Sequence, residues 1–308
     1  MCAELGARGV LVAGGTDLFP KLKRRQMEPD TLVGLTHLRE LHDVARTADG
    51  GLELGALVTL ATASRHPEVA AAHPGYAEAA GLVSSPPLRN VGTIGGNLCV
   101  DTRCNYYDMT YEWRKSIGFC MKKDGEICLV APSSPRCWAV SSSDTAPMAI
   151  ALGATVVLAS PEGERELPVS ALYRDDGIDY LSKQPFEVVT ALRLPPADGL
   201  RTAYVKLRRR GSIDFPLAGA AVALRLRDGG VVESARIVLS GVGSHPVAAV
   251  AADQFLTGKK PDSGIIVQTA ELAARPAKPL DNADLSHFWR KRMVRVIVEQ
   301  ALEKALRT

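Results

Sequence analysis

Apolar and polar positions alternate along the first two thirds of the chain with periods typical of both strands and helices. Short apolar or β-branched runs bounded by turn residues predict strands at 10–12, 31–35, 52–55, 154–159, 164–169 and 186–194. Helical spacing and helix-breaking residues predict helices at 59–66, 74–82 and 145–152. Thr59 could cap the first of these, and His66 marks its end. Residues 1–9 resemble the end of a helix. This irregular mixture indicates an α+β fold.

The last third begins after a clear linker, Leu194-Pro195-Pro196-Ala197-Asp198-Gly199. Strands are predicted at 202–208, 217–226 and 231–239, the last two joined as a hairpin through Asp228-Gly229-Gly230. Helices should follow at 246–256, at 265–274 and from about 284, the last with an apolar face for the core. A length of 308 residues also favours two domains, which we place at 1–197 and 198–308.

Composition narrows the class of protein. The chain is 46% hydrophobic and 23% charged, as expected of a globular protein, and its formal charge is only +3. Its basic runs at 21–25, 208–210 and 290–292 are far apart, so we expect no nucleic-acid partner. No signal peptide opens the chain and no apolar run reaches the roughly 18 residues of a membrane span. These features predict the cytoplasm, where thiols stay reduced.

Four of the six cysteines lie in one segment, at Cys104, Cys120, Cys128 and Cys137, separated by 16, 8 and 9 residues. Four thiolates can ligate an iron–sulfur cluster or a tetrahedral zinc ion. Zinc usually takes closely spaced cysteine pairs, which are absent here, so the spacing favours a larger cluster. Four unrelated thiols remain an alternative, and a disulfide framework is less favoured still.

The residues around these cysteines are consistent with a cluster. Six basic side chains could offset its negative charge: Arg103, Arg114, Lys115, Lys122, Lys123 and Arg136. Three aromatic side chains could exclude water from it: Trp113, Phe119 and Trp138.

Two glycine-rich segments each follow an apolar stretch. The first is Ala13-Gly14-Gly15-Thr16-Asp17, and the second runs from Leu88 to Asn97 and contains Gly92, Gly95 and Gly96. Glycines let backbone N–H groups approach an anion closely, and two such loops can hold the two phosphates of a dinucleotide. Neither segment fits the GxGxxG pattern, which argues against a Rossmann site and a P-loop.

The segments AGGTD at 13–17, RNVGTIGGN at 89–97 and SDTAPMAIALGA at 143–154 resemble the FAD-binding subunit of the xanthine oxidase family of molybdenum hydroxylases. The resemblance covers essentially the whole chain. It implies an FAD-binding domain of the PCMH (vanillyl-alcohol-oxidase-like) type at 1–197, followed by a CO dehydrogenase flavoprotein C-terminal domain. Family members normally begin with an extra strand and most of a helix, so we expect a misassigned start or a fragment.

Within the family, the cysteine insert at about 99–140, including Cys99 to Cys104, resembles the beta subunit of 4-hydroxybenzoyl-CoA reductase. That resemblance implies a 4Fe-4S cluster ligated by Cys104, Cys120, Cys128 and Cys137, with Cys99 and Cys2 left out. It implies that FAD contacts Leu11, Val12, Ala13, Gly14, Gly15, Thr16, Asp17, Leu18, Val83, Thr93, Ile94, Gly95, Gly96, Asn97, Asn105, Asp144, Val188 and Lys206. Asp144, like Ser143, could also cap the helix at 145–152.

The resemblance further implies an electron-transfer subunit that carries no catalytic residue of its own. Its partners would be a molybdopterin-containing large subunit, a small subunit with two 2Fe-2S clusters, and ferredoxin as electron donor, in a dimer of heterotrimers. The reaction would be reductive removal of the phenolic hydroxyl of 4-hydroxybenzoyl-CoA. Two alternatives stay open: the flavin subunit of an aldehyde, xanthine or carbon monoxide dehydrogenase, and a flavin-free, zinc-stapled interaction module.

Overall fold

The structure, a computed structural model, describes residues 2–307, apart from the side chains of residues 2, 3 and 7. It begins with α1 (Cys2–Leu5) and a 3-10 turn at Gly6–Arg8. The positive φ of Gly6, 53°, ends the α-helix earlier than the sequence predicts. β1 (Gly9–Val12) then pairs in parallel with β2 (Thr31–Gly34), and α2 (Leu18–Lys23) lies between them in sequence.

A five-stranded antiparallel sheet forms the centre of the first domain, in the order β3-β4-β7-β5-β6. Its strands are β3 (Val44–Arg46), β4 (Leu52–Gly55), β5 (Thr155–Ser160), β6 (Gly163–Pro168) and β7 (Val188–Leu194). The helices of this domain are α3 (Leu60–Arg65), α4 (Pro67–Ala72), α5 (Pro74–Gly81), α6 (Pro86–Arg89), α7 (Ile94–Leu98) and α9 (Thr145–Leu152). The predicted strands and helices of this region are therefore confirmed, and Thr59 does cap α3.

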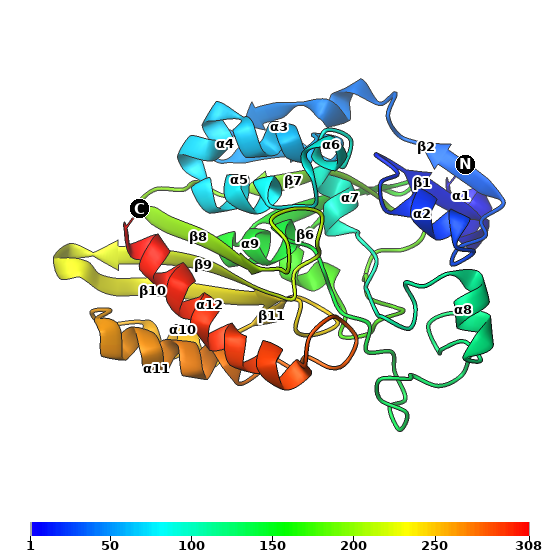
Figure 1. Cartoon of the computed structure of the whole chain (residues 1–308). Helices are drawn as coiled ribbons and strands as arrows, with labels where there is room; N and C mark the ends of the chain where they lie inside the picture. The colour runs from blue at the N-terminus through cyan, green and yellow to red at the C-terminus, as the bar shows by residue number, and fades with distance from the viewer. Residues whose placement is uncertain (1, 308) are drawn as a thin grey trace.

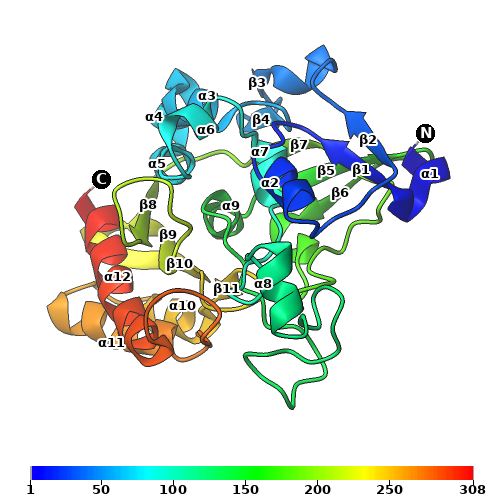
Figure 2. The same ribbon diagram turned by 45° about the vertical axis from the view of Figure 1, so that its right-hand side comes forward.

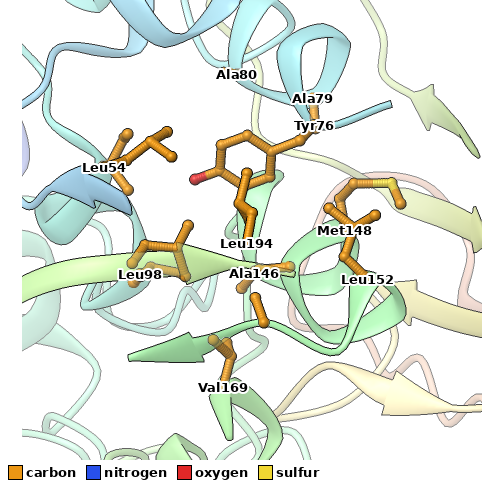
Figure 3. Close-up of a cluster of buried hydrophobic side chains, with 14 of the residues drawn as sticks. Leu54, Tyr76, Ala79, Ala80, Leu98, Ala146, Met148, Leu152, Val169 and Leu194 are labelled. Atoms are coloured by element: carbon orange, nitrogen blue, oxygen red, sulfur yellow. The ribbon is translucent and has the colours of Figure 1, made fainter. Parts of the chain in front are cut away.

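The buried side chains of this domain meet between its helices and its sheet. Figure 3 shows the Tyr76 ring of α5 among Leu54 of β4, Leu98 of α7, Leu194 of β7 and Met148 of α9. All five side chains are fully buried. Because elements far apart in sequence contribute to one core, α7, which contains two glycines of the second glycine-rich segment, is held on a rigid support.

The C-terminal part forms a four-stranded antiparallel sheet in the order β11-β10-β9-β8, with three helices on one face (Figure 1). The strands are β8 (Leu200–Leu207), β9 (Ala218–Arg227), β10 (Val231–Ser240) and β11 (Val247–Ala248), and the helices are α10 (Val250–Leu256), α11 (Ser263–Ala274) and α12 (His287–Arg307). The helix predicted from 246 starts only at Val250, because Val247 and Ala248 pair with β10 instead.

Successive side chains of β9 belong alternately to two cores, so this strand joins the two parts of the molecule. Ala220, Val222 and Leu224 belong to the core under α10–α12, whereas Ala221 and Ala223 belong to the core of the first domain. The cysteine insert contrasts with both regions: it contains one short helix, α8 (Tyr111–Ser116), and in both ribbon views it lies beneath the β1–β2 unit (Figures 1 and 2).

Candidate cofactor site

The first glycine-rich segment connects β1 to α2. Its Gly15 adopts a φ of 67°, which glycine accommodates without strain. In the described chain, no hydrogen bond to a protein acceptor uses the backbone N–H groups of residues 13–17. These donors sit at the start of a helix and are therefore suited to an anion such as a phosphate. Leu11, Val12 and Leu18, which flank the segment, are half-buried.

The second glycine-rich segment is only partly a loop, which corrects the sequence interpretation. Thr93 caps α7 by accepting a hydrogen bond from the Gly96 N–H at 3.1 Å, so Gly95 and Gly96 are helical. The N–H groups of Ile94 and Gly95 donate to the carbonyls of Val58 and Ala56. Most N–H groups of this segment are thus used within the protein. Gly95 is required for packing, since a Cβ there would lie 2.8 Å from the Ala56 Cβ.

The two glycine-rich segments lie against each other. A Cβ on Gly14 would meet the Val91 carbonyl oxygen at 2.0 Å, and one on Gly92 would meet the Thr16 hydroxyl at 3.5 Å. Residues separated by about 75 positions therefore form one surface, as a shared dinucleotide site requires. FAD contact by the individual residues remains a prediction.

Asp144 and Lys206 form a buried ion pair between the two domains. The Lys206 ammonium donates to an Asp144 oxygen at 2.7 Å and to the Leu82 carbonyl at 3.0 Å, while the Tyr204 hydroxyl donates to the other Asp144 oxygen. Both charged side chains are at most 2% exposed. Asp144 makes no capping hydrogen bond to α9; Ser143 accepts the Ala146 N–H instead. Of the two candidate caps, the structure therefore selects Ser143.

The remaining predicted flavin residues differ in their surroundings. The buried Asn97 oxygen accepts hydrogen bonds from Ser143 and Thr145, which ties α7 to α9. Val83 packs partly against the first core, and Val188 begins β7. Asn105 is exposed, and its N–H donates to the Asn282 carbonyl of the C-terminal domain.

The four insert cysteines are brought together. Cys104, Cys120, Cys128 and Cys137 are all buried and line one small cavity. They are free thiols, as is Cys99, which lies outside the cavity. The side chain of Cys2 is outside the described part. Within residues 2–307, no group of three or more His, Cys, Asp or Glu residues is arranged to hold a single ion, so the site is a shared cavity and not a preformed ion site.

Burial governs the acidity of two of these thiols. Burial, with a smaller contribution from the neighbouring cysteines, raises the pKa of Cys104 to about 12 and that of Cys137 to about 11. Thiols so buried become thiolates when a positively charged metal centre replaces their protons. Four buried sulfurs around one cavity are a donor set whose chemistry fits a thiolate-ligated metal cluster.

The six basic residues of the segment differ in their distance from the cavity and in their partners. Of the six basic residues, only Lys122 lines the cavity. Arg114 donates to the carbonyls of Arg24 and Arg25, and Arg136 pairs with Asp175. Lys115 is exposed, Lys123 pairs with Glu28 and Asp124, and Arg103 pairs with Asp17 and Asp108. The cavity is lined instead by Tyr106, Met121, Leu129 and Ala139; Trp113, Phe119 and Trp138 do not line it.

Arg103 joins the first glycine-rich segment to the cysteine cavity, a link that the sequence did not reveal. Its guanidinium donates to Asp17 and, at 2.9 Å, to Asp108. The second oxygen of Asp108 accepts the N–H of Cys104 at 3.0 Å. One chain of charged hydrogen bonds therefore runs from the candidate phosphate site to a candidate metal ligand.

Comparison with known proteins agrees with this geometry. The family described as FAD binding domain in molybdopterin dehydrogenase matches residues 2–197, and the CO dehydrogenase flavoprotein C-terminal domain matches residues 202–305. The chain belongs to the FAD-binding subunits of the molybdenum hydroxylase family. Its mixed helix-and-sheet fold is that of these two domains, and the protein is an oxidoreductase subunit.

Individual relatives extend over most of the chain. The FAD-binding subunit PaoB of an aldehyde oxidoreductase from Escherichia coli is 32% identical over 80% of this chain and 78% of its own. The carbon monoxide dehydrogenase medium chain of Afipia carboxidovorans is 28% identical over 99% of this chain and 91% of its own. A solved carbon monoxide dehydrogenase structure from Hydrogenophaga pseudoflava superposes with a TM-score of 0.80 at 27% identity, over 99% and 91%. Within residues 2–307, no helix is long and apolar enough to cross a membrane.

Proposed function

We propose that this FAD-binding subunit carries a second redox group, a 4Fe-4S cluster ligated by Cys104, Cys120, Cys128 and Cys137. The observation that carries the proposal is that four thiols spread over 34 residues of chain line one cavity. A flavin exchanges one or two electrons and a 4Fe-4S cluster one, so the chain would pass electrons between one-electron and two-electron carriers.

The FAD would lie where the two glycine-rich segments meet. The N–H groups of residues 13–17 would donate to the pyrophosphate, because they lack protein acceptors. The flanking positions Leu11, Val12 and Leu18, the helix residues Thr93 to Asn97, and Val83, Asn105, Asp144, Val188 and Lys206 complete the proposed contacts. Asp144 and Lys206 neutralise each other, so we propose that they position the domains around the flavin and carry no net charge to it.

For the finer identity we propose the electron-transfer subunit of a 4-hydroxybenzoyl-CoA reductase, supported by the cysteine insert and its resemblance. It would assemble with a molybdopterin-containing subunit and a subunit with two 2Fe-2S clusters, as a dimer of heterotrimers in the cytoplasm. Reduced ferredoxin would supply the electrons, and the large subunit would remove the phenolic hydroxyl. The rival is a flavin subunit of aldehyde, xanthine or carbon monoxide oxidation, favoured by the names of the relatives.

Replacement of one cavity cysteine tests the cluster. Cys120→Ser should lose the iron and acid-labile sulfide of the purified protein while retaining FAD, because the glycine-rich segments are untouched. Cys99→Ser is the matched control: this cysteine is also partly buried but lies outside the cavity, so its iron content should equal that of the wild type. Equal iron content in Cys120→Ser and wild type would refute the ligand assignment.

The substrate is tested on the complex purified with its partner subunits. Anaerobic incubation with 4-hydroxybenzoyl-CoA and a reduced low-potential donor should yield benzoyl-CoA. Oxidation of an aldehyde, xanthine or carbon monoxide with an electron acceptor, and no benzoyl-CoA, would favour the rival while leaving the cluster assignment intact.

A further inference from the structure

Two buried lysines and a partly buried aspartate connect α2, which follows the first glycine-rich segment, to the cysteine cavity. Lys21, on α2, is 1% exposed and donates to one oxygen of Asp101 at 2.6 Å. Lys122, from the insert, is 5% exposed and donates to the other oxygen of Asp101 at 2.7 Å. We call these three residues the charge bridge. Its ends lie 101 residues apart in sequence.

Lys122 is held in one position. Its ammonium has three donors, and the structure gives it three oxygens: Asp101, the Thr102 hydroxyl at 2.8 Å and the Gly177 carbonyl. The Gly177 N–H in turn donates to the Cys137 carbonyl at 2.9 Å. The rings of Tyr107 and Tyr180 lie 4.9 and 5.5 Å from the ammonium. Lys122 lines the cavity, and these contacts fix the position of its ammonium.

The charge bridge carries a net charge of +1, from two ammonium groups and one carboxylate. Burial by itself raises the pKa of Asp101, but Lys122 and Lys21 lower it below its ordinary value, which keeps the carboxylate ionised. Burying an excess charge is costly unless something compensates it. Four thiolates and a cluster have a net negative charge, and the other five basic residues of the insert do not line the cavity.

We propose that the charge bridge sets the reduction potential of the redox group in the cysteine cavity. Lys122 supplies the positive charge at the cavity, and Asp101 and Lys21 act through it, because their charges oppose or add to that of Lys122. The inference rests on the proposed cluster. Reduction adds one electron, breaks no bond and moves no proton, so the site becomes more negative by one charge. A fixed cation nearby stabilises that reduced state and raises the potential, more strongly in a buried site than in water.

The charges of the bridge predict shifts of opposite sign. Lys122→Gln removes a positive charge and should move the cluster midpoint potential to a more negative value. Asp101→Asn removes a negative charge and should move it to a more positive value. Lys122→Arg keeps the positive charge, so its midpoint potential should stay close to that of the wild type. Lys123→Gln is the matched control, since this adjacent lysine pairs with Glu28 and Asp124 and does not line the cavity, and it should leave the potential unchanged.

The measurement is an anaerobic redox titration with dithionite and mediators, followed by electron paramagnetic resonance, on protein whose iron, sulfide and FAD have been quantified. Opposite shifts in Lys122→Gln and Asp101→Asn support the inference; shifts of the same sign, or none, overturn it while the cluster itself stands. If Lys122→Gln loses the cluster, Lys21→Gln, which does not line the cavity, must show the negative shift or the inference fails. Wild-type protein without iron and sulfide would overturn the proposed function first.

Discussion

The flavin region and the cysteine insert are built in contrasting ways. The second glycine-rich segment is held by α7, which packs into a large apolar core, whereas the first lies between β1 and α2 and is held against the second by the close approach of Gly14 to Val91. The insert has one short helix, and its small buried cluster consists largely of the cysteines themselves. Its order comes from fixed ion pairs, such as those of Arg103 and Lys122. Apolar packing thus orders much of the first region, whereas ion pairs order much of the insert.

The largest effect is expected from two glycine substitutions, each of which should remove one cofactor and spare the other. Gly14→Ala places a Cβ 2.0 Å from the Val91 oxygen, so it should abolish FAD retention while leaving the iron content intact. Gly177→Ala places a Cβ 2.6 Å from the Cys137 sulfur and should do the reverse. Gly34→Ala, which meets nothing within 4 Å, is the control and should change neither. Flavin absorbance measures the FAD content, and metal analysis measures the iron content. Loss of both cofactors in either variant would contradict the view that the two regions are ordered independently.

The buried ion pair beside the flavin region gives the next largest effect. Lys206→Met leaves the Asp144 carboxylate buried without its cation, which should lower the free energy of unfolding by about 3–5 kcal/mol. Lys304→Met removes a half-exposed pair with Glu78 and should cost less than about 1 kcal/mol. Urea unfolding followed by tryptophan fluorescence compares the two. Equal losses would mean that the interdomain pair does not determine stability.

The stability of the first domain should decrease in acid. His73 is fully buried, and burial lowers its pKa from the ordinary 6.5 to about 4. The native state therefore binds fewer protons than the unfolded state between these values, so stability is lost as the pH falls from 6.5 towards 4. The loss should reach about 3 kcal/mol at most.

The variant His73→Phe removes this titration. Its stability relative to the wild type should rise as the pH is lowered from 7 to 4.5, when both are unfolded in urea at each pH. A pH-independent difference between His73→Phe and the wild type would show that His73 does not contribute.

The sequence predicted the elements well because their signals are local. Apolar runs, the Thr59 cap and the Asp228-Gly229-Gly230 hairpin each act within a few residues. The position of the four cysteines in one cavity also followed from their crowding. Sheet order was not predictable, since Leu52 pairs with Leu194, more than 140 residues away.

Polar partners were the other limit of prediction. Lys122 could not be told apart from the five neighbouring basic residues, because only folding brings Asp101 and Gly177 to it. The Asp144–Lys206 pair likewise depends on how the domains meet, so the sequence offered only a helix cap and a cation. The helical conformation of Gly95 and Gly96 was missed because glycine pairs usually indicate turns; here Thr93 provides the cap.

The central claim is that one chain holds both a flavin and an iron–sulfur cluster. Its most direct test is the content of iron, acid-labile sulfide, zinc and FAD per chain in anaerobically purified protein, together with the visible spectrum. The account predicts about four irons, four sulfides and one FAD, with no stoichiometric zinc. FAD without iron and sulfide, in protein never exposed to oxygen, would contradict it.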